Sequence, residues 1–322
     1  SPGASSAGSG AATAAFLCAA SLGEDTGGSI RNPAAYSGVV GLRPTWGRVS
    51  RHGVIGGCWS MDTMGPLART VEDCALMFQA IAGHDAKDPH SSREPVADYR
   101  PALDGRIGGV KVGLISELLD SGIVDREVVD ATRQAATELD GLGAVVEEVS
   151  IPILEHAGAI SQVITYTEGA FMQWDYLRTR SEEMDSLART RKLVGALIPA
   201  QVYHKALRLR EVVRRRVLEA LERFDVLVCP SAPTEAPEIP SSPDIIQSKD
   251  EVLANIWGRS RVNAPFNLAS VPALSVPSGF TSNNLPTGLQ VVGSPLDEWT
   301  VLKVGHAYEQ ATSWHTRRPP VG

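Results

Sequence analysis

The sequence predicts an α/β fold, in which helices pack against a sheet that contains parallel strands. The first observation is a strand–helix–strand unit: residues 110–115 are mostly apolar, residues 125–139 have helical periodicity, and residues 144–149 form a second strand. With 43% hydrophobic residues, the 322-residue chain is long enough to bury a large core. Further short apolar strands are expected at residues 226–228, 274–276 and 288–292.

The first fifty residues are rich in Gly, Ala and Ser. They predict a turn at residues 1–6, a helix of small residues over 8–20, and a second, glycine-rich turn over 23–29. Small side chains let backbone segments approach one another closely. We therefore expect the two turns to lie near each other, joined by a buried helix.

Two helical regions follow. Residues 69–82 form a helix in which Thr70 is the N-cap, Asp73 lies three residues later and Gly83 marks the end. Residues 155–224 are expected to be almost wholly helical, because apolar side chains recur there at intervals of three to four or seven residues. The arginines at 214–216 fall on or near the solvated face of this region.

Prolines interrupt the chain after the strand at 226–228. Five of them between residues 230 and 243 exclude regular structure, so this segment is either a surface linker or a rigid wall of a pocket. A helix is expected near residues 250–257, and a closing helix over 299–312 completes the predicted elements.

Composition excludes several classes of protein. Lys and Arg number 30 against 37 Asp and Glu, and a net charge of -7 argues against a sequence-independent nucleic-acid surface. No apolar run reaches the roughly 18 residues of a membrane span. Because no C-x-x-C spacing occurs, we expect neither a disulfide framework nor a zinc site. Free cysteines are typical of a reducing compartment, so we expect a cytoplasmic protein. The four cysteines are Cys18, Cys58, Cys74 and Cys229.

The glycine-rich turn Thr26-Gly27-Gly28-Ser29 has the pattern of an acyl-transfer site. Two glycines before a hydroxyl let consecutive backbone N–H groups point into one small space, as an oxyanion hole requires. Ser29 would then be the nucleophile at its rim. The alternative interpretation is a tight loop without chemistry. The chain has no G-x-S-x-G, P-loop, H-E-x-x-H or G-x-G-x-x-G motif to compete with this site.

A serine hydroxyl needs a base to take its proton. The seven histidines are scattered along the sequence, so we consider the Ser-Lys variant of the triad. A lysine can serve only if burial lowers its pKa from about 10.4. A second serine between lysine and nucleophile would relay the proton. Only six lysines are present, and none precedes Lys87.

Two motifs together resemble the amidase signature family, whose members are Ser-cisSer-Lys amide hydrolases. Ser5-Ser6 matches the paired serines of the family, and the segment from Gly23 to Arg31 matches its nucleophile motif 24 positions further on. The resemblance reaches both ends of the chain. It continues through residues 38–45, 47–50, 59–62, 65–73, 267–277 and 288–293.

The resemblance implies a single large domain over residues 1–322, with a central twisted mixed β-sheet surrounded by helices. Its parts would be a signature core at 1–100, a variable helical segment at 151–225, and C-terminal strands with the closing helix at 226–322. It further implies that no cofactor or metal is needed. The expected substrate is a small-molecule amide, with no nucleic acid and no membrane as partner, and a homodimer is a further expectation.

The resemblance also assigns roles to residues of the two turns. Ser29 attacks the amide carbonyl, while Ser5, which lies in a cis peptide in the family, relays the proton. The oxyanion would be held by backbone amides, and three side chains would support the loop. The amides are those of Thr26, Gly27, Gly28 and Ser29, and the supporting residues are Ser6, Asp25 and Arg31.

Some positions depart from the family pattern. The catalytic lysine of the family lies well before the paired serines, so we expect a missing N-terminal segment to carry it. Glu24 replaces the usual Thr, and alanines at 4 and 7 replace glycines. Cys58 and Trp59 stand where pocket residues often lie, although a buried cysteine more often only packs. Tyr166, Phe171, Met172 and Trp174 either line an apolar entrance or belong to the core.

Three functions remain open from the sequence. The first is an amidase that acts on linear amides through an acyl-serine on Ser29. The alternative is a non-catalytic, amidase-like binding module. The third is the A subunit of an aminoacyl-tRNA amidotransferase, which we rank last because residues 242–247 replace the glutamine-recognising Asp-Pro-Leu-x-Met-Tyr-x-x-Asp motif.

Overall fold

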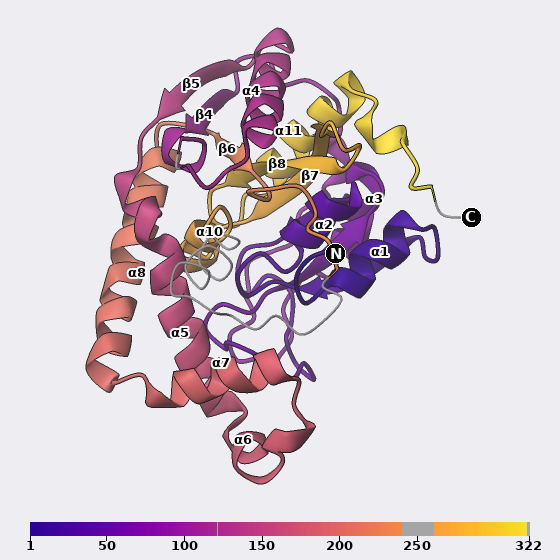
Figure 1. The fold of residues 1–322 in the computed structure, drawn as a ribbon. Coiled ribbons are helices and arrows are strands. Elements are labelled where there is room, and N and C mark those ends of the chain that lie inside the picture. The colour runs from indigo at the N-terminus through magenta and orange to yellow at the C-terminus, as the bar shows by residue number, and fades with distance from the viewer. Residues whose placement is uncertain (121, 240–260, 321–322) are drawn as a thin grey trace.

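A computed structural model describes residues 1–120, 122–239 and 261–320 (Figure 1). Eight strands form one sheet in the order β1-β3-β2-β7-β8-β6-β4-β5. β4 runs parallel to β5 and β6, and the other pairs are antiparallel, so the expected mixed sheet is confirmed. The strands are β1 (Ala20–Glu24), β2 (Val40–Arg43), β3 (Met64–Ala68), β4 (Lys111–Ile115), β5 (Val145–Val149), β6 (Val226–Pro230), β7 (Ala273–Phe280) and β8 (Pro286–Gly293).

Helices cover both faces of this sheet (Figure 1). Alternate strand residues divide between two cores: Leu274 and Val291 pack with α3, α4 and α11, whereas Ala273 and Val292 pack with α5, α8 and α10. The described helices are α1 (Ala7–Ala14), α2 (Arg31–Ser37), α3 (Val71–Ile81), α4 (Arg126–Gly141), α5 (Ala157–Met172), α6 (Trp174–Thr179), α7 (Ser186–Leu197), α8 (Ala200–Leu221), α10 (Ala264–Ala269) and α11 (Glu298–Ala311).

Several predicted elements are confirmed with small shifts in their ends. The Thr70 hydroxyl accepts a hydrogen bond from the Asp73 N–H at 3.1 Å, so α3 begins with the predicted cap. α4 connects the parallel strands β4 and β5, as the strand–helix–strand unit predicted. The helical region expected over 155–224 consists of α5, α6, α7 and α8.

The helix expected over residues 8–20 is wrong in its second half. α1 ends at Ala14, where Phe16 adopts a positive φ of 61° and the Leu17 N–H returns to the Ala12 carbonyl at 2.9 Å. β1 follows and pairs antiparallel with β3, so Glu24 is the last residue of a strand rather than part of a turn. The helix expected near 250–257 lies outside the described residues.

The start of the proline-rich segment is not a surface linker. Ser231 and Ala232 are buried, and the Ser231 N–H donates to the Gly288 carbonyl of β8 at 2.8 Å. The Pro233 carbonyl accepts from the Asp125 N–H at 2.8 Å, ahead of α4. These residues therefore continue the core beside the sheet.

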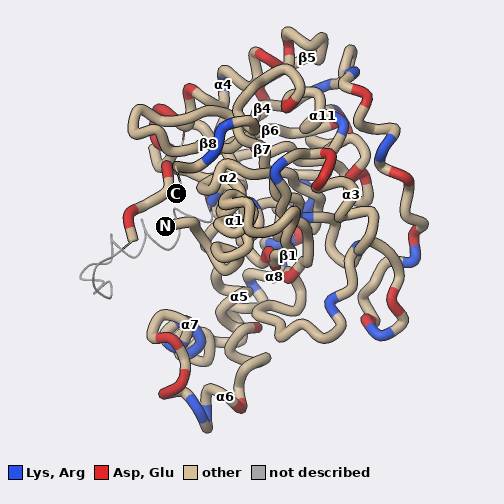
Figure 2. The backbone as a smooth tube through the Cα atoms, turned by 90° about the vertical axis from the view of Figure 1, so that its right-hand side faces the viewer, with Lys and Arg blue, Asp and Glu red and all other residues tan. Residues whose placement is uncertain are grey.

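Basic and acidic residues are interspersed over the described chain (Figure 2). Within the described ranges, no helix combines the length and apolarity needed to cross a membrane. All four cysteines are free thiols.

Candidate active site

The nucleophile loop, which we define as residues 25–29, connects β1 to α2. Gly28 has a φ of +113°, and a Cβ there would lie 2.8 Å from the Asn263 side chain. Only glycine fits both requirements. A Cβ on Gly27 would meet nothing within 4 Å, so that position is open on its side-chain face.

Asp25 holds this loop in place from inside. Its carboxylate accepts the Gly28 N–H at 2.8 Å and the Ile30 N–H at 3.2 Å. The side chain is fully buried and forms ion pairs with Arg31 at 3.0 Å and Arg43 at 3.6 Å. Burial alone would raise the pKa of Asp25, but the charges of Arg31 and Arg43 outweigh it and hold that pKa well below its usual range. The carboxylate is thus a permanently charged anchor.

The two arginines tie this anchor to distant parts of the chain. Arg31 also donates to the side chains of Gln290 on β8 and Asn267 on α10. Arg43, on β2, donates to the Asp25 carbonyl and to the Met61 carbonyl, and burial lowers the pKa of Arg43 to about 10. Sequence reasoning singled out Arg31 but missed Arg43, because nothing local distinguishes an arginine inside a strand.

The free backbone donors of the loop differ from the expected set. The Gly28 N–H already donates a charge-assisted hydrogen bond to the Asp25 carboxylate. This N–H is therefore not free to bind a substrate oxygen. The N–H groups of Thr26, Gly27 and Ser29 have no acceptor among the described residues. The candidate oxyanion donors therefore reduce from four to these three.

The two predicted catalytic serines lie together. The Ser5 N–H donates to the Ser29 Oγ at 3.4 Å, across 24 positions of sequence. Ser6 is buried, and its hydroxyl donates to the Glu24 carbonyl at 3.2 Å and accepts the Glu24 N–H at 3.1 Å. This exchange fixes the start of α1 against the end of β1.

Two features implied by the family are absent from this part of the structure. No peptide bond of the described residues is cis, so Ser5 lies in the trans geometry that non-proline bonds prefer by about 3 kcal/mol. No lysine in the described ranges hydrogen-bonds to Ser5 or Ser29. The base of the reaction stays a prediction.

Glu24 and Asp62 share one hydroxyl beside the loop. The Thr26 Oγ1 lies 2.5 Å from Glu24 Oε1 and 2.7 Å from Asp62 Oδ1. A hydroxyl carries one proton, so it donates to one carboxyl and accepts from the other only if that carboxyl is protonated. Burial and the negative charge of Asp62 raise the pKa of Glu24 to about 8. Glu24 is therefore the neutral acid of the pair near pH 7.

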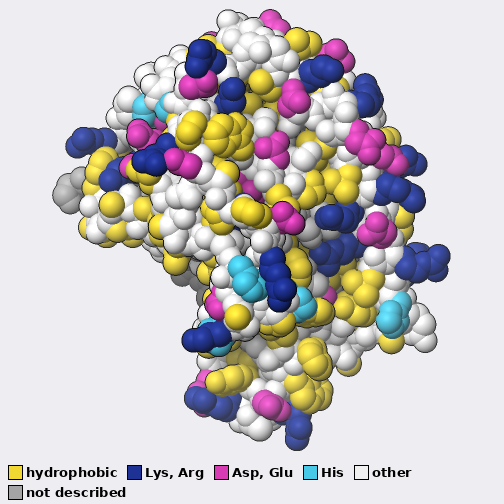
Figure 3. Space-filling model, turned by 180° about the vertical axis from the view of Figure 1, so that it is seen from behind, with side chains coloured by type: hydrophobic (Ala, Val, Ile, Leu, Met, Phe, Trp, Pro, Cys, Tyr) yellow, Lys and Arg dark blue, Asp and Glu magenta, His cyan; other side chains and the backbone are white. Residues whose placement is uncertain are grey.

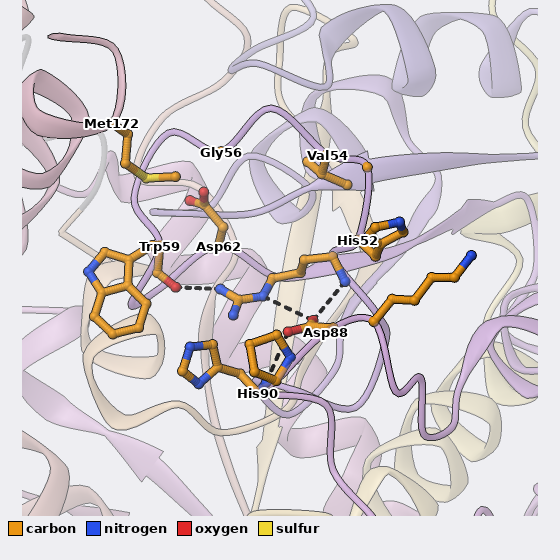
Figure 4. A pocket seen from close by; sticks show the side chains of 12 residues that line it. His52, Val54, Gly56, Trp59, Asp62, Asp88, His90 and Met172 are labelled. Carbon is orange, nitrogen blue, oxygen red and sulfur yellow. Dashed lines mark hydrogen bonds and ion pairs between the residues drawn. The ribbon is translucent and has the colours of Figure 1, made fainter.

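Cys58 and Trp59 have separate environments. Cys58 is fully buried and its Sγ lies 3.1 Å from Glu168 Oε2, so its role as a pocket residue stays a prediction. Burial and the Glu168 charge raise the pKa of the thiol, which stays protonated. Trp59 is 45% exposed and lines a cavity of about 290 Å³ (Figure 4). Asp62 lines the same cavity and links it to the nucleophile loop through Thr26.

Glu168 is a residue that sequence reasoning missed. Its buried carboxylate accepts the Ser60 hydroxyl at 2.8 Å, the Ser60 N–H at 3.1 Å and the Tyr203 hydroxyl at 3.0 Å. Arg210 of α8 adds bonds to the same serine. The available signal was one acidic residue inside the otherwise uncharged sequence of α5. Glu168 ties the helical segment to the loop that carries Asp62.

The aromatic residues near the end of α5 are not core residues. Phe171 is 78% exposed and Trp174 is 47% exposed, while Met172 lines the cavity beside Trp59. The exposure of Phe171 and Trp174 opposes core packing for these two residues, and the apolar entrance stays a prediction.

Comparisons with known proteins agree with this fold. The family model described as Amidase matches residues 1–302. The chain belongs to the amidase signature family.

Individual relatives carry more specific names. The A subunit of glutamyl-tRNA(Gln) amidotransferase from Thermosynechococcus vestitus is 40% identical over 98% of this chain and 69% of its own length. The crystal structure of the same subunit from Thermotoga maritima has a TM-score of 0.82 at 32% identity, covering 96% of this chain and 66% of that one. A bacterial aryl acylamidase has a TM-score of 0.83 at 25% identity, covering 98% and 66%. The chain thus spans about two thirds of the length of these proteins.

Proposed function

We propose that this chain forms most of the active site of an enzyme that hydrolyses a carboxamide C–N bond through an acyl-serine. The observation that carries the proposal is the nucleophile loop itself. Ser29 lies on a loop that Asp25 and Arg31 hold in place, and three backbone N–H groups of this loop, including its own, have no acceptor among the residues that the structure describes. Preorganised donors of this kind each stabilise a developing oxyanion by about 3 to 4 kcal/mol.

The proposed reaction has two steps, acylation of Ser29 and hydrolysis of the acyl-serine. The Ser29 Oγ attacks the amide carbonyl, and its proton passes through Ser5 to a lysine supplied from outside the 322 residues. The C–N bond then breaks, the nitrogen takes that proton, and the amine or ammonia leaves. Water attacks the acyl-serine in the second step, giving the carboxylic acid and restoring Ser29. Thr26, Gly27 and Ser29 hold the oxyanion through their N–H groups in both steps.

A second candidate is the A subunit of an amidotransferase, in which glutamine is the amide and the released ammonia serves a partner subunit. The 40% identity to the A subunit of glutamyl-tRNA(Gln) amidotransferase favours it. The sequence of residues 242–247 opposes it, because the family's glutamine-recognising motif is not found there. We therefore place a small linear amide first and glutamine second.

Both candidates are tested with a protein that joins this chain to an N-terminal segment carrying the lysine. Ammonia release from benzamide and from glutamine, measured separately, distinguishes an amidase from the amidotransferase component. Ser29→Ala should lower the rate of ammonia release from the amide that is hydrolysed by at least about 10³-fold. Ser282→Ala, an exposed serine outside the site, is the matched control.

A non-catalytic binding module makes the opposite prediction. Such a protein would release no ammonia from either amide, and Ser29→Ala would change nothing. That outcome would overturn the proposed function.

A further inference from the structure

Trp59 lines a cavity beside the nucleophile loop. It is lined by residues 51–54, 56, 59 and 62, by residues 87–90 and by Met172 at the end of α5 (Figure 4). Its volume of about 290 Å³ suits a small organic molecule. Neither Ser5 nor Ser29 lines it, so it is a neighbour of the nucleophile loop rather than part of it.

The two carboxylates of the cavity are already occupied by internal donors. Asp88 accepts the Arg51 N–H at 2.9 Å and the His90 N–H at 3.0 Å. Asp62 accepts the Gly57 N–H at 2.7 Å and the Cys58 N–H at 2.8 Å, besides its contact with the Thr26 hydroxyl. Each of the two carboxylates therefore already accepts at least two hydrogen bonds from the protein itself.

The cationic groups, in contrast, have donors to spare. Arg51 donates through Nη1 to the Trp59 carbonyl, and its buried Nε forms an ion pair with Asp88 at 3.6 Å. Its Nη2 has no hydrogen-bond acceptor among the described residues. Lys87 is exposed and forms no ion pair with the carboxylates that the structure describes. The neighbouring Asp85 is held by the Ser50 hydroxyl at 2.7 Å and by the Lys87 main-chain N–H at 2.9 Å. The Nη2 of Arg51 and the ammonium of Lys87 are therefore available to an anion.

An aromatic and apolar wall completes the cavity. The rings of Trp59 and His90 lie 5.1 Å apart, and His90 lies 5.3 Å from Trp46 on its other side. The Arg51 guanidinium stacks 4.7 Å from the Trp46 ring, which orients it. From behind, histidine and basic side chains lie beside hydrophobic ones in the lower half of the molecule (Figure 3). Trp59 and Met172 offer a flat surface to a ring.

We propose that this cavity binds a small organic carboxylate. The carboxylate takes the unpaired donors of Arg51 and Lys87, and the apolar part of the ligand lies against Trp59 and Met172. Phosphate alone would leave that wall uncovered, and a neutral molecule would leave the cations unpaired. Because Asp62 lines the cavity and bonds to Thr26, an occupant would lie one side chain away from the candidate oxyanion donors. This inference does not depend on Ser29 being catalytic.

Calorimetric titration of the 322-residue chain with benzoate and with benzamide tests the proposal, since the two probes share a ring and differ in charge. Benzoate should saturate one site and bind at least about tenfold tighter than benzamide. Lys87→Gln should weaken benzoate at least about fivefold and leave benzamide unchanged, because only the charge is removed. Lys205→Gln, another exposed lysine, is the matched control.

Trp59→Ala separates the wall from the charges. It should weaken both probes, because it removes the surface on which the ring lies. Equal affinities for benzoate and benzamide, unchanged benzoate binding in Lys87→Gln, or no saturable benzoate binding would each overturn the proposal. An unchanged midpoint of thermal unfolding in every variant establishes that a change in affinity does not come from a loss of folding.

Discussion

Arg31 donates two parallel hydrogen bonds to Asp25, from Nε to Oδ2 at 3.0 Å and from Nη2 to Oδ1 at 3.0 Å, and both side chains are fully buried. The remaining capacity of the carboxylate is used by the Gly28 and Ile30 N–H groups and by Asn267. One ion pair therefore fixes the path of the nucleophile loop and the start of α2. Stability and loop geometry depend on the same two residues.

Asp25→Asn should destabilise the fold by about 3 to 5 kcal/mol, because it leaves Arg31 and Arg43 buried without their counter-charge. The free energy of unfolding in urea measures this. Asp98→Asn removes an exposed ion pair with Arg100 and should leave the unfolding midpoint unchanged. If both variants unfolded at the wild-type midpoint, the anchoring role of Asp25 would be wrong.

Gly28→Ala and Gly27→Ala should differ sharply although the residues are adjacent. At Gly28 the positive φ and the Asn263 contact oppose any Cβ, so we expect a loss of about 1 to 3 kcal/mol of stability and of most activity. At Gly27 a Cβ has open space and the N–H is retained, so the fold should persist. Urea unfolding of the two variants side by side checks this. Equal stability would contradict the packing of Asn263 against Gly28.

Stability should fall as pH rises from about 4.5 to 8. The pKa of Glu24 is raised from 4.5 to about 8 in the folded protein, so its stabilising contribution is complete below pH 4.5 and is lost as the pH rises through 8. One proton gives a slope of up to about 1.4 kcal/mol per pH unit in this window. Glu309, whose pKa burial raises to about 7, adds a slope of the same sign.

Glu24→Gln isolates the first of these two groups. The amide can donate to the Thr26 hydroxyl as the protonated acid does, but it cannot ionise. The variant should therefore gain stability over the wild type as pH rises, with the smallest difference at pH 5 and the largest at pH 8. Unfolding free energies at four pH values measure this. Parallel profiles for the two proteins would mean that the pKa of Glu24 is not raised in the folded protein.

The sequence predicted those elements whose signals are local. α3 has its cap at Thr70, and β4, α4 and β5 follow from apolar periodicity. β1 and β2 were not predicted, because their strand conformation comes from pairing with β3 and β7. β7 lies about 230 positions from β2 in the sequence, so no local pattern could reveal that partner.

The site shows the same division. Ser5 and Ser29 were found through their motifs, and the structure places the Ser5 N–H 3.4 Å from the Ser29 Oγ. The contact between Cys58 and Glu168 was not predicted, because the two residues lie 110 positions apart in the sequence. The bond from Gly28 to Asp25 could not be predicted either, because glycine spacing does not show which N–H groups turn inward. Contacts across the sheet decide these details.

The central claim is that Ser29 is the nucleophile, and the most direct test is intact-mass analysis with a fluorophosphonate probe. In a protein that pairs this chain with the lysine-bearing segment, we predict one phosphonate adduct, located on Ser29 by peptide mapping. Ser29→Ala should form none, Ser5→Ala should react more slowly by at least about 10²-fold, and Ser282→Ala should react as the wild type does. Adduct formation that is undiminished in Ser29→Ala would contradict the account.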